Sequence, residues 1–173
     1  MRRLVCSLLV CAACEAPSTA ADALSLSLRE GASDPDAFAA ALSEVELVIA
    51  VLDGNDGEGG RCIVGQRCAD FFDVLDDGAV PSSVEDLQAA LKNEAPPLFD
   101  FATEDATSLT IVGRRRVDGC FCPQSDGADE AFCGANDQVC GVAELADADE
   151  DGRLRVTLTE TPCPERARTL CPP

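Results

Sequence analysis

Eleven cysteines without a single histidine are the feature that most limits what this chain can fold into. Three of the cysteines lie within the first fifteen residues, and the other eight are spread over residues 62–171. Cysteines in this number act either as disulfide partners or as metal ligands. The leader has to be interpreted first, because it decides how many cysteines the folded domain keeps.

The first twenty residues have the layout of a secretory signal. Arg2 and Arg3 give a positive start, residues 4–13 are uncharged and mostly apolar, and a run of small and polar residues follows. An apolar run of about 10 residues is too short to span a bilayer as a helix, which needs about 20. The segment therefore predicts export and cleavage, without a permanent transmembrane helix.

The end of this leader resembles the lipobox of bacterial lipoproteins. The sequence CAAC over residues 11–14 places two small residues before Cys14, at which such proteins receive diacylglycerol and begin after cleavage. The resemblance covers the leader only, and Cys11 stands where these motifs usually have Leu. It implies a signal peptide over residues 1–13, lipid attachment at Cys14 and a lipidated tether over residues 14–22.

Ordinary secretion, with cleavage after Ala20 or Ala21, is the alternative interpretation of the leader. A lipid anchor would hold the protein at the bacterial outer membrane, in the periplasm or at the cell surface, because several acyl chains together give stable membrane attachment. Both interpretations leave eight cysteines in the mature chain. The disulfide candidates are Cys62, Cys68, Cys120, Cys122, Cys133, Cys140, Cys163 and Cys171.

These eight cysteines favour disulfides over metal binding. Their number is even, and the compartments that exported proteins reach are oxidising, so thiols can form disulfides there. Without histidine, a zinc site would need four thiolates or carboxylates, and the paired spacing typical of such sites is missing. We expect Cys62 and Cys68 to close a small loop on each other, and Cys163 and Cys171 to fix the C-terminal tail.

Charge and composition exclude several function classes. Without Arg2 and Arg3 the chain has 11 basic and 32 acidic residues, a net charge of −21, which disfavours nucleic-acid binding. The absence of histidine removes the Ser–His and Cys–His nucleophile pairs, so we do not expect an enzyme. A thiol-redox or hydrolytic enzyme is a distant alternative.

Hydrophobic periodicity predicts a mainly β domain with two short helices. Alternating or continuous apolar runs predict strands at residues 24–28, 44–52, 109–112, 139–145 and 154–159, with the second of these in the centre of a sheet. The fold class is a single, small, disulfide-stabilised β-sandwich-like domain over residues 23–173. A compact α+β fold, with the strand–helix–strand segment at residues 24–52 packed on one sheet, is the alternative.

Two helix starts can be recognised from capping patterns. Asp34 followed by Pro35 predicts an N-cap and first helical residue, with Phe38 and Leu42 on one face of the helix. Ser82 and Glu85 form a capping-box pattern, which predicts a second helix over residues 83–92. Between the two helices, residues 53–60 are rich in Gly and Asp and predict a flexible turn.

An acidic stretch near residue 150 resembles the start of an EF-hand calcium loop. Acidic residues occupy its first, third and fifth positions, and Gly152 occupies the sixth, but Leu158 stands where a bidentate Glu is required. An acidic hairpin turn, with Gly152 at positive φ, is the favoured interpretation. For a calcium site the ligands would be Asp147, Asp149, Asp151 and the backbone carbonyl of Arg153.

Three consecutive arginines at residues 114–116 form the densest basic run in the chain. Such a run could meet an anionic ligand or lipid headgroups, although ion pairs with the many carboxylates at a strand end are the favoured interpretation.

Taken together, the sequence predicts an exported, membrane-anchored envelope or surface lipoprotein with a structural or protein-binding role. A secreted calcium-binding module is the alternative.

Overall fold

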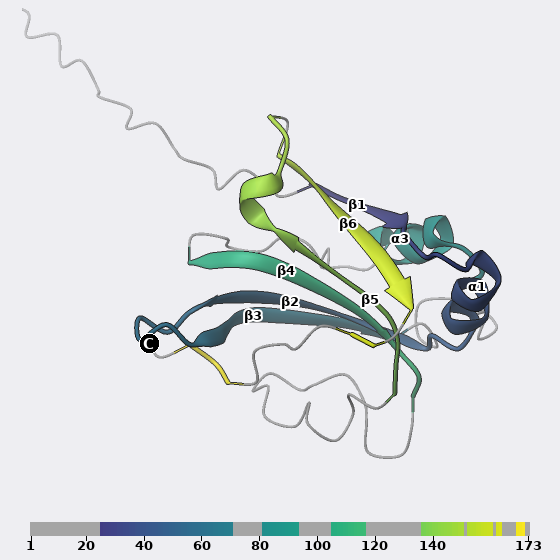
Figure 1. Cartoon of the computed structure of the whole chain (residues 1–173), viewed down its shortest axis with the longest axis horizontal. Coiled ribbons are helices and arrows are strands. Elements are labelled where there is room, and N and C mark those ends of the chain that lie inside the picture. The colour runs from purple at the N-terminus through teal and green to yellow at the C-terminus, as the bar shows by residue number, and fades with distance from the viewer. Residues whose placement is uncertain are drawn as a thin grey trace, which may run out of the picture.

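A computed structural model describes residues 25–70, 81–93, 105–116, 136–150, 152–160, 162–163 and 169–171 (Figure 1). The predicted leader and Cys120, Cys122 and Cys133 lie outside these residues. The described strands are β1 (Ser25–Glu30), β2 (Leu47–Asn55), β3 (Arg61–Asp70), β4 (Ala106–Arg114), β5 (Asp137–Glu144) and β6 (Arg153–Glu160). The helices are α1 (Pro35–Ser43) and α3 (Val84–Asn93), with a short 3₁₀ turn, η3 (Leu145–Asp147).

The six described strands form one sheet in the order β1-β6-β5-β4-β2-β3. Only the β1–β6 pair is parallel; the other pairs are antiparallel. β5 and β6 share just two register pairs, at Val139 and Cys140, and Figure 1 shows the β1–β6 pair splaying away from β2, β3 and β4. Gly141 instead permits a close approach of β5 to β6, because a Cβ there would collide with the backbone carbonyl of Thr157 on β6.

The main core fills the face of the sheet that packs against the helices. Phe38 and Leu42 of α1 and Leu87 of α3 are buried there, as the four-residue spacing of the first two predicts. They meet the inward side chains of the strands, which alternate with outward ones along β1 and β6. The buried inward strand residues are Leu26, Leu28, Val48, Ala50, Leu52, Ala69, Leu109, Ile111, Val139, Leu154, Val156 and Leu158.

The central position of β2 follows from its sequence. Its residues from Leu47 to Gly54 are all buried, and Leu47, Ile49 and Val51 form a second apolar cluster with Ile63 on the other face of the sheet. A strand buried on both faces carries a continuous apolar run. The prediction of a central strand here is confirmed.

Two disulfides tie distant parts of the described chain together. Cys62 pairs with Cys171 and Cys140 pairs with Cys163, so the predicted attachment of the tail through Cys163 and Cys171 is confirmed. The expected bond between Cys62 and Cys68 is wrong. Both lie on β3, where six residues span about 20 Å, far beyond the ~6 Å between the Cα atoms of a disulfide. Cys68 is disulfide-bonded to a partner outside the described residues.

The prediction of a mainly β, disulfide-stabilised domain with two short helices is confirmed. Disulfides persist in oxidising compartments, which agrees with export from the cytoplasm. Within the described part of the chain, neither helix has the length and apolar character that crossing a membrane requires.

Both edge strands of the sheet have partners that cover part of their exposed backbone. Along β3, Ile63 N–H donates to the carbonyl of Thr169 at 2.7 Å, and Cys171 N–H donates to the carbonyl of Ile63 at 2.9 Å. Along β1, Leu28 N–H donates to Oε1 of Gln88, on α3, at 2.8 Å. These contacts reduce the backbone that is available for pairing with another chain.

The helix caps confirm one prediction and correct another. The Asp34 carboxylate accepts hydrogen bonds from the backbone N–H groups of Asp36 and Ala37, both at 3.1 Å, as predicted. The cap of α3 is shifted by one residue from the predicted Ser82 and Glu85 pair. Ser83 Oγ accepts from Asp86 N–H at 3.1 Å, and the Asp86 carboxylate accepts from the hydroxyl of Ser82 at 2.7 Å. The shift keeps Val84 and Leu87 facing the core.

This cap predicts a pH-dependent contribution to stability. Hydrogen bonds from the Ser82 and Ser83 side chains and from the Ser82 backbone lower the pKa of Asp86 below its ordinary 3.8. A lowered pKa means that the stabilisation is fully present above pH 3.8 and disappears as the pH falls through the folded-state pKa. In an NMR titration, we expect Ser82→Ala to raise the Asp86 pKa toward 3.8. An unchanged Asp86 pKa in that variant would show that Ser82 does not cause the shift.

Candidate functional site

The arginine run predicted at residues 114–116 does not form an exposed anionic-ligand site. Arg114 lies at the end of β4 with 2% of its side chain exposed, and its Nε donates to Oδ1 of Asp137 at 2.7 Å. Asp137 is the residue opposite Arg114 in the β4–β5 register, and its side chain is 4% exposed. The first arginine is therefore part of a buried ion pair.

The next two arginines also face carboxylates. Arg115 Nη1 lies 3.3 Å from Oε2 of Glu44, in an exposed pair, and the backbone N–H of Arg116 donates to Oε2 of Glu46 at 2.7 Å. The interpretation of the run as ion pairing at a strand end is confirmed for Arg114 and Arg115. The burial of Arg114 was not predicted; Thr110 and Val112, which share its face of β4, are buried too.

A second buried charge lies on the same face of the sheet. Asp53 has no exposed surface, and its Oδ2 accepts from Nη2 of Arg61 at 2.7 Å and from Oγ1 of Thr110 at 3.2 Å. Its other carboxylate oxygen, Oδ1, is buried without a hydrogen-bond partner. The predicted turn over residues 53–60 is thus shorter than expected, because Asp53 belongs to β2.

The carboxylate of Asp56 stabilises the remaining turn between β2 and β3. Oδ1 of Asp56 accepts from the backbone N–H groups of Glu58 at 2.9 Å and Gly60 at 2.8 Å. Gly57 and Gly59 adopt φ angles of 82° and 91°, a left-handed region that favours glycine. These bonds stabilise the predicted turn, and its flexibility stays a prediction.

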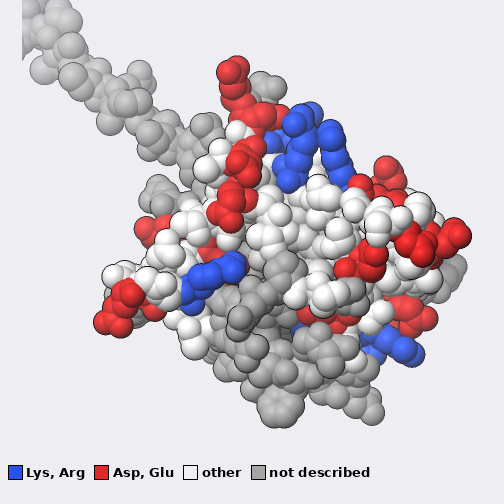
Figure 2. Space-filling view, viewed as in Figure 1, with Lys and Arg blue, Asp and Glu red and all other residues white. Residues whose placement is uncertain are grey.

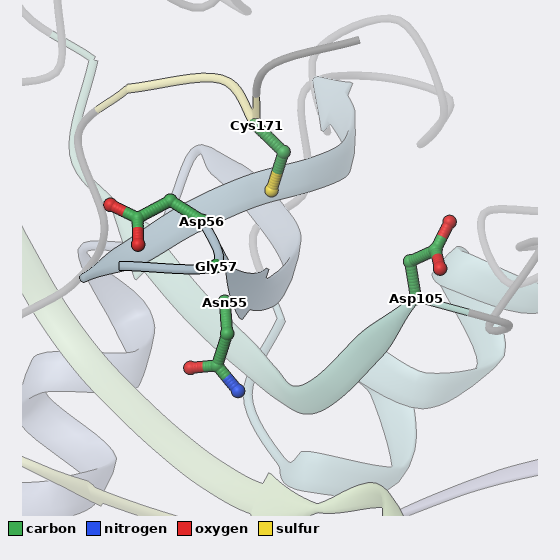
Figure 3. Close-up of a pocket in the computed structure, with 5 residues that line it drawn as sticks. All are labelled: Asn55, Asp56, Gly57, Asp105 and Cys171. Carbon is green, nitrogen blue, oxygen red and sulfur yellow. The ribbon is translucent and has the colours of Figure 1, made fainter. Parts of the chain in front are cut away.

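A shallow pocket of about 420 Å³ opens beside this turn (Figure 3). Figure 3 shows Asp56 and Asp105 on opposite sides of it, with Cys171 between them. The lining is polar and acidic, and it draws on three segments that are distant in the sequence: the β2–β3 turn, the start of β4 and the C-terminal segment. Its residues are Asn55, Asp56, Gly57, Asp105 and Cys171.

The acidic stretch near residue 150 forms the predicted hairpin turn. Asp149 Oδ1 accepts from Arg153 N–H at 2.8 Å, and Gly152 N–H donates to the carbonyl of Asp149 at 2.8 Å. Gly152 has a φ angle of 71°, so its predicted role in the turn is confirmed. Oδ2 of Asp149 lies 3.6 Å from Nη2 of Arg155.

Calcium binding by Asp147, Asp149, Asp151 and the carbonyl of Arg153 stays a prediction. Asp151 is outside the described residues, and Asp149 already accepts a bond within the turn. Across the described ranges, no three acidic, cysteine or histidine side chains are grouped closely enough to hold a metal ion.

Comparisons with protein-family models, with curated proteins and with solved structures found no match to this chain.

Proposed function

We propose that this protein is an exported bacterial lipoprotein, anchored in the cell-envelope membrane through Cys14, with a structural or protein-binding role. The observation that carries the proposal is the pair of disulfides, Cys62–Cys171 and Cys140–Cys163. Such bonds form in oxidising compartments outside the cytoplasm. The signal-like leader, which ends in the CAAC sequence, supplies the means of export and the site of anchoring.

The length of the tether fits an anchored domain. Ten residues separate Cys14 from Ser25, the first residue of β1. Fully extended, such a segment spans at most about 35 Å. The lipid would therefore hold the folded domain close to the membrane surface, where a protein partner in the envelope can reach it.

A structural or binding role suits the chemistry of the chain better than catalysis. The sequence has no histidine, the commonest general base, and no tyrosine or tryptophan. Its strong negative charge keeps it soluble and disfavours nucleic acid as a partner.

Replacing the lipidated cysteine tests the anchor. We expect Cys14→Ser to abolish lipidation, so that the protein is no longer recovered in the membrane fraction of an exporting bacterium. Cys6→Ser is the matched control: it removes a leader cysteine that lies outside the CAAC sequence and is expected to leave lipidation and fractionation unchanged. Intact mass spectrometry of the membrane-extracted protein reads the added lipid directly.

An N-terminus at Ala21 or Asp22, without lipid, would overturn the anchor and indicate ordinary secretion. Identical fractionation of Cys14→Ser and Cys6→Ser would also overturn the anchor. Export itself would still stand in the first case, because removal of the leader accompanies export.

A further inference from the structure

The outer face of the β1–β6 pair carries an unusual set of side chains for so acidic a protein. Along these strands Leu26, Leu28, Leu154, Val156 and Leu158 point into the core. The intervening residues point outward, because side chains alternate between the two faces of a strand. The outward residues with described side chains are Ser27, Arg29, Arg153, Arg155, Thr157 and Thr159.

Three of these six residues are arginines, and none is acidic, although the whole chain has 32 acidic residues. The parallel register sets Ser27 opposite Arg155 and Arg29 opposite Thr157, so the cations alternate with hydroxyls across the pair. Figure 2 shows basic side chains gathered over β1 and β6, with acidic side chains at the border of the gathering. Arg29, Arg153 and Arg155 are all exposed.

One carboxylate approaches this face from the β5–β6 turn. Asp149 Oδ2 lies 3.6 Å from Arg155 Nη2, and 51% of the Arg155 side chain remains exposed. An exposed pair at that distance is weak. The guanidinium groups are therefore available to an external anion, and their planar forks match phosphate oxygens.

The tether of the proposed lipoprotein leads into the start of β1, one of the two strands that carry this face. The register places Ser25, the first residue of β1, opposite Arg153. The lipid at Cys14 would thus be connected to a strand of the outer face through the ten residues between Cys14 and Ser25. Among the described strands, β1 is the one nearest to Cys14 along the chain.

We infer that the outer face of β1–β6 is the surface with which the tethered domain faces anionic phospholipid headgroups. A strongly acidic domain close to a negatively charged membrane is repelled over most of its surface. Screening over about 8 Å at physiological salt makes the nearest charges decide its orientation. The only outward face of described strands that combines three arginines with hydroxyls is then turned toward the lipid.

This inference rests on the proposed lipid anchor, and it predicts orientation without independent binding. Because acidic side chains border the face, it is expected to orient a domain that is already anchored and to leave an unanchored one in solution. The lipid holds the domain at the membrane surface, and the arginines determine which face of the domain is turned toward the membrane.

Arginine footprinting on the membrane-bound protein tests the orientation. The lipidated protein, with its anchor first verified by intact mass, is reconstituted into vesicles of phosphatidylcholine with or without phosphatidylglycerol and modified with phenylglyoxal. We expect phosphatidylglycerol to slow modification of Arg29, Arg153 and Arg155 about fivefold, as one favourable cation contact implies. Arg115, exposed on another part of the molecule, is the internal control and is expected to react equally in both vesicles.

A protein tethered artificially separates this inference from the anchor. If mass spectrometry finds no lipid, an N-terminal histidine tag on nickel-chelating lipid replaces it, and the footprint is measured again. Loss of the phosphatidylglycerol effect on the three arginines at high salt supports the inference, as does its loss at Arg29 in the double variant R153Q/R155Q, which keeps Arg29 as the reporter.

Equal modification of Arg29, Arg153 and Arg155 in vesicles with and without phosphatidylglycerol would overturn the inference, as would protection of Arg115 instead. Protection that appears only when an acidic envelope protein is added would also overturn it and would assign the face to that partner. The two substitutions lie on an exposed face, and the circular dichroism melting curve of the variant verifies that it folds.

Discussion

Removing the Cys62–Cys171 cross-link, as the double variant C62S/C171S, is expected to lower the free energy of unfolding by about 4–5 kcal/mol. The bond joins residues separated by 109 positions, and the entropy that a cross-link removes from the unfolded chain grows with the closed loop. The same bond also holds the C-terminal segment against the edge of β3. Replacing both cysteines avoids leaving one thiol free to form another bond.

The matched control is C140S/C163S, which removes a cross-link between residues separated by 23 positions. Its expected cost is about 3 kcal/mol, so the two variants should differ by more than about 1 kcal/mol. Urea denaturation with a common baseline measures both. If the short cross-link costs as much as the long one, loop closure is not the main source of the stabilisation.

Replacing Arg114 with methionine is expected to destabilise the domain by about 3–5 kcal/mol. Arg114 and Asp137 have side chains only 2% and 4% exposed, and they are joined at 2.7 Å. Without the guanidinium, the Asp137 carboxylate loses its Arg114 partner in a site with little access to water. Breaking a buried ion pair by removing one partner is far more costly than losing a surface pair.

Two further variants test whether the broken ion pair causes the loss of stability in R114M. R114M/D137L removes both partners and is expected to recover most of the stability, because Arg114 Nη2 is itself buried without a hydrogen-bond partner. R115M changes the neighbouring arginine, 58% exposed, and should alter stability by less than about 0.5 kcal/mol. A loss below about 1 kcal/mol in R114M would contradict the account of this pair.

Local patterns were sufficient to predict most of the elements of this fold. The continuous apolar run at residues 47–52 marked β2 as a central strand, and the alternation at residues 154–158 separated the core side of β6 from its outer side. Asp34 and Pro35 marked the start of α1. In each case neighbouring residues contain the information, because burial on one or two faces imposes its own period.

The disulfide pairing could not be predicted, because it depends on contacts between distant segments. Eight cysteines allow 105 arrangements, and spacing along the chain favoured the nearest pair. The extended geometry of β3 prevents that pair and brings Cys171 to Cys62 instead. The burial of Arg114 was missed for a related reason: its partner Asp137 comes from the next strand in the sheet.

The outer face of β1–β6 could be predicted only in part from the sequence. Arg153 and Arg155 alternate with core residues, so their outward direction follows from period two. Arg29 joins them only through the parallel pairing of strands from opposite ends of the chain. Long-range pairing of this kind leaves no signal in the local sequence, whereas the consecutive arginines at residues 114–116 form a pattern that the sequence alone shows.

Peptide mapping without reduction, on the protein purified from the organism that makes it, tests the central claim most directly. An exported, oxidised domain predicts a chain that lacks its leader, with cross-linked peptides that join Cys62 to Cys171 and Cys140 to Cys163. A folded cytoplasmic protein that starts at Met1 and carries these four cysteines as free thiols would contradict it.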